Sequence, residues 1–262
     1  MNIKTLITII SVWSVVLSCN KDDSADNAFN YLEVEYYEHF SSSGREIFLN
    51  LKTLETFPCS NFQLEVNQNR SNNHLDIKVS DIQVPDVCIT ALGPATQTLS
   101  LGQTSFAPSK LTLWVNENQH DVSINIDKNT ISVLPGNTFK DHLFFAFDSL
   151  MRIPDNTVWG FAAFEIQTNE KSQNVWSEIN EAFAEAGAKD FTLEDGFYYY
   201  FLVKDSIIHF ENIKQNLHTF YFLFEEDLDV LVDIYERIME NHNSSSMQLR
   251  LFDTKGERRH VL

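Results

Sequence analysis

The sequence contains little cysteine, glycine, proline or positive charge. Its 262 residues include three Cys, eight Gly and six Pro, and 19 Lys and Arg stand against 37 Asp and Glu. So few glycines provide no Gly-rich phosphate loop, and the formal net charge of −18 argues against nucleic acid as a partner. Because 43% of the residues are apolar, the chain is nevertheless predicted to bury a core.

Motifs for catalysis and metal binding are also lacking. The eight histidines include no pair at metal-ligand spacing, and no HExxH motif or Gly-x-Ser-x-Gly elbow occurs. We therefore predict no metal, no cofactor and no catalytic residue from motifs. The abundant carboxylates leave acid–base chemistry open.

The first residues have the pattern of an export signal. Lys4 is the only charge among the first twenty residues, and the apolar run at 6–17 is too short to span a bilayer comfortably. With the small residue Ser18 after it, residues 1–18 are predicted to be a signal peptide. The sequence Val16-Leu17-Ser18-Cys19 resembles a bacterial lipobox, and this resemblance implies cleavage before Cys19 and acylation at that residue. An ordinary signal peptide with a chance cysteine is the alternative.

Residues 19–29 form an acidic tether that contains Lys21-Asp22-Asp23. This segment resembles the tether of surface lipoproteins of the Bacteroidota, although a generic polar linker would have the same composition. The resemblance implies an outer-membrane lipoprotein, held by its lipid anchor and facing the cell surface, with the periplasmic face as the alternative. It covers only the N-terminal end and says nothing about the folded part.

Two further cysteines remain for the folded part. Cys59 and Cys88 are an even pair in an exported chain, so we predict a disulfide between them. A buried pair of free thiols is the alternative. A metal site is disfavoured, because no Cys or His lies at ligand spacing from either residue.

Residues 30–134 alternate between apolar and polar side chains, as half-buried strands do. Asn- and Ser-rich turns separate the strands. One apolar face per strand favours two antiparallel sheets packed face to face, so this segment is predicted to be an immunoglobulin-like β-sandwich domain.

Residues 138–262 have a mixed pattern. Apolar residues recur at helical spacing over 175–186 and 228–239, with Gly187 as a stop signal and Asp227 as an N-cap. Five strands are predicted around these helices, at 158–166, 197–203, 207–210, 217–224 and 247–252. The order resembles a ferredoxin-like α+β domain with an extra strand.

Several strands of the second half are apolar on both faces, as in Trp159–Ile166. Two helices on one side of the sheet would leave a larger apolar face bare than a soluble monomer normally exposes. We expect one of three covers: a helix formed by Asp141–Met151, the β-sandwich domain, or a partner or ligand.

The functional prediction is a non-enzymatic binding or assembly component at the envelope, contacting a glycan, a peptide or an envelope protein. Trp114 is expected to point outward from its strand, where its ring could stack on a sugar. A hydrolase that uses carboxylates of the second half, acting on a glycan or a peptide, is the alternative. A purely structural subunit is the third reading.

Overall fold

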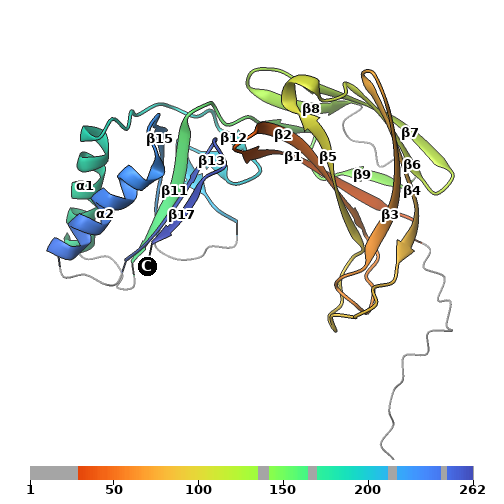
Figure 1. Ribbon diagram of the computed structural model, residues 1–262, viewed down its shortest axis with the longest axis horizontal. Helices are drawn as coiled ribbons and strands as arrows, with labels where there is room; N and C mark the ends of the chain where they lie inside the picture. Colours follow the sequence, from red (N-terminus) through yellow and green to blue (C-terminus); the bar gives the residue numbers. More distant parts are fainter. Residues whose placement is uncertain (1–28, 135–141, 165–169, 212–216, 243–246, 262) are drawn as a thin grey trace, which may run out of the picture.

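The computed structural model describes residues 29–134, 142–164, 170–211, 217–242 and 247–261. It is mostly β-sheet with two α-helices, arranged as a large curved sheet and a smaller α+β part (Figure 1). The predicted signal peptide, most of the tether and Cys19 lie outside the described residues. The described chain begins at Phe29, which is buried against the large sheet.

The first part is one ten-stranded sheet in the order β10-β8-β7-β6-β4-β3-β5-β2-β1-β9. Its strands are β1 (Leu32–Ser41), β2 (Gly44–Thr53), β3 (Gln63–Ser71), β4 (His74–Gln83), β5 (Thr96–Gln103), β6 (Lys110–Val115), β7 (Asn118–Ile126), β8 (Thr130–Leu134), β9 (Leu143–Phe145) and β10 (Ser149–Met151). A short 3-10 helix, η1 (Thr104–Phe106), follows β5.

This sheet curls back on itself (Figure 1). Its edge strands, β9 and β10, are joined only by residues 146–148, a link that spans roughly 14 Å at most. Side chains from both ends of the strand order therefore share one core, and the Tyr36 hydroxyl of β1 donates to the Ile131 carbonyl of β8 at 3.4 Å. Where two separate sheets were expected, the strand pairing is continuous. Alternation of apolar residues is the same in both arrangements, so the sequence did not distinguish them.

The strand pairing also extends the first sheet past residues 134–138, where a domain boundary was predicted. Leu143–Phe145 pairs in parallel with β1, and Ser149–Met151 pairs with β8, so the first sheet continues to Met151. The helix expected over Asp141–Met151 is wrong for the described residues 142–151, which contain two short strands. Apolar residues at this spacing also suit strands, and the open edges of β1 and β8 offer backbone partners.

The second part contains β11 (Thr157–Phe164), α1 (Glu170–Glu185), β15 (Leu217–Leu223), α2 (Leu228–Asn241), β16 (Met247–Asp253) and β17 (Arg258–Val261). The four strands form an antiparallel sheet in the order β15-β11-β16-β17. The chain order is therefore β-α-β-α-β-β, whereas a ferredoxin-like plait runs β-α-β-β-α-β. Both helices and the strands β11, β15 and β16 were predicted, whereas β17 was not, and the connection differs from that fold.

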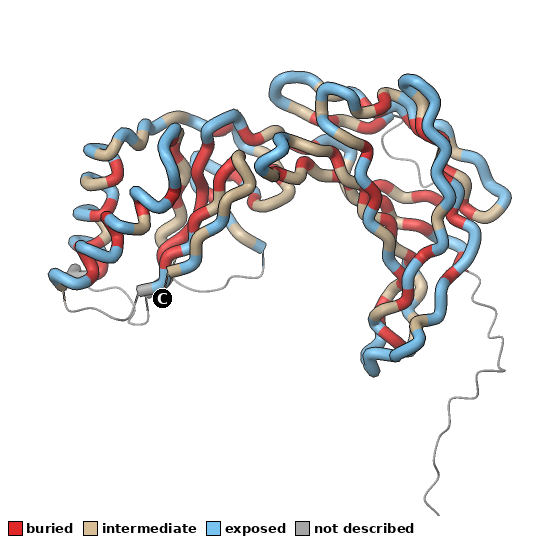
Figure 2. The backbone as a smooth tube through the Cα atoms, viewed as in Figure 1, coloured by how far each residue is buried: buried red, intermediate tan, exposed pale blue. Residues whose placement is uncertain are grey.

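Both helices pack on the same side of this sheet (Figures 1 and 2). Asp227 caps α2 as predicted, since its side chain accepts a hydrogen bond from the Asp229 amide at 2.8 Å. Gly187 follows α1 with a φ of +105°, the left-handed conformation that glycine adopts readily.

The opposite apolar face of this sheet is covered by the chain itself. Residues 190–210 carry the small sheet β12 (Gly196–Phe197), β13 (Leu202–Lys204) and β14 (Ile207–His209), and they pack on Trp159 together with Phe40 of β1. The first part contributes Phe40 and the partly buried Met151 to the cover, and Ile153 of the link after β10 is also buried there. Most of the cover comes from an insertion between α1 and β15.

Candidate functional site

The two parts of the molecule meet where the β1–β2 hairpin reaches the β16–β17 turn. Gly256 lies so close to this hairpin that an added Cβ would be 2.5 Å from Ser41 Cα and 2.6 Å from the Phe40 carbonyl oxygen. On the other side of the contact, Phe40 packs edge-on against Trp159 with 5.8 Å between ring centroids. The hairpin therefore packs directly against the α+β part, and position 256 has no room for a side chain larger than that of glycine.

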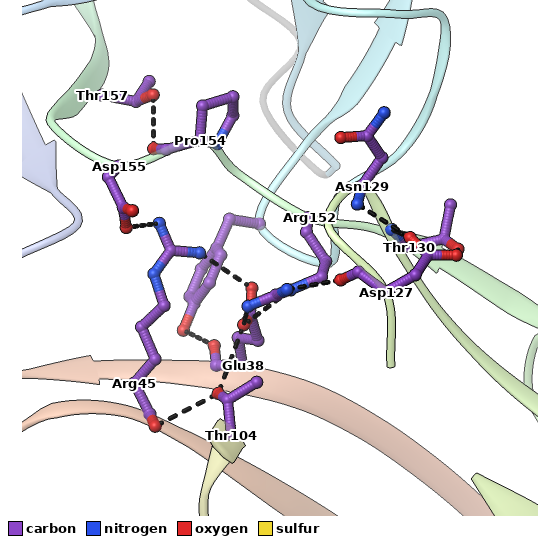
Figure 3. A network of polar contacts seen from close by, with 11 residues as sticks. Glu38, Arg45, Thr104, Asp127, Asn129, Thr130, Arg152, Pro154, Asp155 and Thr157 are labelled. Atoms are coloured by element: carbon purple, nitrogen blue, oxygen red, sulfur yellow. Dashed lines mark hydrogen bonds and ion pairs between the residues drawn. The ribbon is translucent and has the colours of Figure 1, made fainter. Parts of the chain in front are cut away.

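A buried carboxylate lies at the centre of this junction (Figure 3). Glu38 is 4% exposed, and its Oε1 accepts hydrogen bonds from Arg152 at 3.0 and 2.7 Å. Arg45 approaches Oε2 at 3.2 Å and also pairs with Asp155 at 2.7 Å. Both oxygens of Glu38 are engaged by guanidinium groups. We therefore read Glu38 as a fixed structural anion that joins β1, β2 and the segment after β10.

Three consecutive tyrosines add an aromatic contact to the same junction. Tyr199 stacks on Tyr37 of β1 with 4.2 Å between centroids and an interplanar angle of 6°. The Tyr200 hydroxyl donates to the Glu38 carbonyl oxygen at 2.7 Å. Burial raises the pKa of Tyr199 to about 12, so this phenol stays neutral at physiological pH. The insertion between α1 and β15 thus contacts β1 through a stacked ring and a hydrogen bond.

Sequence reasoning did not single out Glu38, although the sequence carried a signal for it. In β1 the residues Leu32, Val34, Tyr36, Glu38 and Phe40 alternate inward, and all five are buried. A carboxylate at an inward position of an otherwise apolar series indicates a buried partner of opposite charge.

A narrow crevice at the junction contains two carboxylates of the α+β part. It has a volume of about 120 Å³, and its lining includes Trp159, Tyr200, Asp253 and Glu257. Ligand sites for small molecules usually measure about 300–1,000 Å³, so this crevice is too small for a sugar ring or a peptide.

Asp253 has a structural task inside that crevice. Its Oδ1 accepts the backbone amides of Lys255 at 3.0 Å and Glu257 at 2.7 Å, which shapes the β16–β17 turn. Burial raises the pKa of Asp253, and these amides partly oppose the effect. This crevice gives no support to the hydrolase alternative, which stays a prediction.

Trp114 lies on β6 and is half-buried. Its neighbours Leu113 and Val115 are fully buried, so the Trp114 side chain is on the opposite, outer face of the sheet. Its cross-strand partners are Lys78 of β4 and Gln119 of β7. Its role in stacking stays a prediction.

A row of hydrogen bonds runs across the outer face beside Trp114. The Thr112 hydroxyl donates to Asp121 Oδ1 at 2.8 Å, and Gln119 Nε2 donates to the same oxygen at 3.0 Å. Thr112 also lies 2.9 Å from His74 Nε2. The hydrogen bonds from Gln119 and Thr112 lower the pKa of Asp121, so the carboxylate remains ionised. These hydrogen bonds hold the side chains of this face in place.

The predicted disulfide is confirmed. Cys59 and Cys88 are bonded, with 5.2 Å between their Cα atoms. The bond joins the loop after β2 to the loop after β4 at the end of the sheet opposite the junction (Figure 1).

Within the described residues, no group of three or more His, Cys, Asp or Glu side chains is arranged to hold a metal ion, and none of the described helices has the length and apolar character needed to cross a membrane. No protein-family model matches the chain, and neither a curated protein nor a solved structure is significantly similar to it.

Proposed function

We propose that this protein is an envelope-anchored lipoprotein that acts as a non-enzymatic binding or assembly component, and that a glycan is its ligand. The anchor is Cys19, in the outer membrane, with the folded part at the cell surface. The disulfide supports export, because disulfides persist mainly in oxidising compartments. We further infer that the curled sheet serves as a β-sandwich-like scaffold for the binding face.

The observation that carries the binding proposal is the outer face around Trp114. An aromatic ring lies beside hydrogen-bonding groups of both kinds, with Lys78 and Gln119 as donors and Asp121 as an acceptor. Sugar recognition needs this combination, because a pyranose has an apolar face and a rim of hydroxyls. By contrast, the buried carboxylates Glu38 and Asp253 are occupied by structural contacts.

The anchor is tested by metabolic labelling with a fatty acid. The wild-type protein is expected to carry the label and to remain in the membrane fraction, whereas Cys19→Ala is expected to lose both. An unlabelled wild-type protein recovered from the cytosol would refute the anchor.

The binding face is tested with a glycan array and the folded chain from residue 27. Trp114→Ala is expected to weaken binding of a hit about tenfold, the equivalent of one aromatic contact of about 1.4 kcal/mol. Phe106→Ala is the control, because Phe106 is 74% exposed but lies in η1, beside the junction. Equal binding by both variants, or no binding of any glycan by the wild type, would count against the proposal.

A further inference from the structure

Six large apolar side chains are exposed at the disulfide end of the sheet. Four belong to the loop after β4, and the other two lie directly before β1 and directly after β2. We call this surface the apolar tip, and its members are Val84, Val87, Ile89, Leu92, Leu54 and Tyr31. Val87 and Leu92 are 76% and 78% exposed, which is unusual for branched apolar residues.

The apolar tip is held in this exposed conformation by several contacts. The disulfide fixes Cys88 to Cys59, and the Ser60 amide donates to the Ile89 carbonyl at 3.1 Å. The Asn61 side chain forms hydrogen bonds with the two residues that flank Cys88. Its Nδ2 donates to the Val87 carbonyl at 2.7 Å, and its Oδ1 accepts a hydrogen bond from the Ile89 amide at 3.0 Å. A loop clamped in this way cannot easily fold its apolar side chains inward.

The described chain begins beside the apolar tip. The Asn30 amide donates to Glu55 Oε1 at 2.8 Å, and the Leu54 amide donates to the Tyr31 carbonyl at 3.2 Å. From Cys19 to Phe29 there are ten Cα–Cα steps, so a fully extended tether reaches about 36 Å at most. An acyl anchor at Cys19 would therefore keep this end of the molecule close to the lipid surface.

The charge around the apolar tip indicates what kind of contact it makes. The loops at 53–62 and 84–95 contain no Lys or Arg, and their charged residues are Glu55 and Asp86. Attraction to anionic headgroups is therefore excluded as the driving force. The driving force that remains is the burial of apolar side chains between lipid headgroups.

We propose that the apolar tip rests in the interfacial layer of the lipid bilayer. This inference builds on the lipid anchor proposed above, and it adds a second contact of the protein with the membrane. The short tether keeps the apolar tip near the lipid surface, and the disulfide fixes the conformation of its loop. The apolar side chains make the contact with the lipid.

The test attaches the protein to lipid by chemistry, so that it does not depend on natural acylation. The chain from Cys19 to Leu262 has one free thiol when Cys59 and Cys88 are bonded. This thiol is coupled to maleimide-phosphatidylethanolamine in phosphatidylcholine vesicles. Hydrogen–deuterium exchange at residues 84–93 is then compared with the same chain capped by N-ethylmaleimide in solution.

Attachment to vesicles is expected to slow exchange at residues 84–93 severalfold. The double variant Val87→Asp and Leu92→Asp is expected to lose this protection, whereas Phe106→Asp keeps it, because that equally exposed residue is next to the junction. Unchanged exchange in the attached wild type, or equal protection in the double variant, would overturn the proposal. Protection that appears only after envelope proteins are added would assign the apolar tip to a protein partner instead. Fatty-acid labelling of the native protein reports separately on the anchor.

Discussion

Glu38 is the buried charge at the centre of the junction. Its carboxylate is shared by Arg45 and Arg152, whose side chains are each 15% exposed. Removing one member of such a buried set leaves the other charges without compensation, which is more costly than loss of the attraction alone.

We expect Glu38→Ala to lower the free energy of unfolding by about 3–5 kcal/mol. Glu33→Ala is the matched control on the same strand, because Glu33 pairs with the more exposed Lys52 at 3.1 Å and its loss should cost about 0–1 kcal/mol. Urea unfolding of both variants measures the difference. Similar values for the two would show that the guanidinium pairs contribute little.

Asp253 is expected to make stability depend on pH. Burial raises its pKa in the folded state above the ordinary value of 3.8, so the folded state binds this proton more tightly than the unfolded state does. This term destabilises the fold above the raised pKa, and the penalty disappears as the pH falls through that pKa toward 3.8.

Asp253→Asn keeps an oxygen for the turn and removes the charge. We expect the variant to be more stable than the wild type at neutral pH, with the difference shrinking as the solution is acidified. Urea unfolding across this range provides the measurement. A variant that is less stable at every pH would show that the turn needs the carboxylate itself.

The sequence pattern predicted which face of the sheet a side chain lies on better than it predicted the hydrogen-bond partners of that side chain. The alternation in β6 correctly assigned Leu111, Leu113 and Val115 to the core and Trp114 to the other face. It did not predict the hydrogen bonds of Thr112 with Asp121 and His74, because these residues come from three strands whose order is set by long-range pairing.

At the scale of elements, local signals were sufficient for elements whose conformation follows from their own sequence. Both helices were predicted, each with one end signal, and so were the strands β11, β15 and β16 of the antiparallel sheet, whereas β17 was not predicted. The helix over Asp141–Met151, one of the three expected covers, is wrong for the described residues 142–151, because their conformation depends on the free edges of β1 and β8.

The disulfide is expected to stabilise the first part by restricting the unfolded chain. Replacing both Cys59 and Cys88 by Ser opens a loop with a sequence separation of 29 and should cost roughly 3.5 kcal/mol in the chain-entropy estimate. Thermal unfolding of the double variant tests this value. If the melting temperature is unchanged, hydrogen bonds such as those of Asn61 already hold the loop without the bond.

At the scale of the molecule, the two parts are joined by close packing at Gly256. We expect Gly256→Ala to push the β1–β2 hairpin away, and small-angle X-ray scattering should then show a larger radius of gyration. Overpacking of this kind typically costs about 1–3 kcal/mol.

Gly44→Ala is a suitable control for this prediction. Gly44 also has a positive φ, +114° against +86° for Gly256, but nothing lies within 4 Å of the position of its added Cβ. Both variants carry backbone strain, and only Gly256→Ala carries a clash. Equal scattering curves would mean that the hairpin contact does not set the arrangement.

Strand β1 connects the apolar tip with the junction between the two parts. Its Leu32 end adjoins the apolar tip and its Ser41 end meets the α+β part, and the ten residues of the strand separate these ends by about 30 Å of extended backbone. Because β1 is paired with β2 and β9, its two ends are held at a fixed separation. In a cell that holds the protein by its N-terminus, the helices would be carried at a fixed height above the lipid, clear of the headgroups and within reach of large molecules that never touch the membrane.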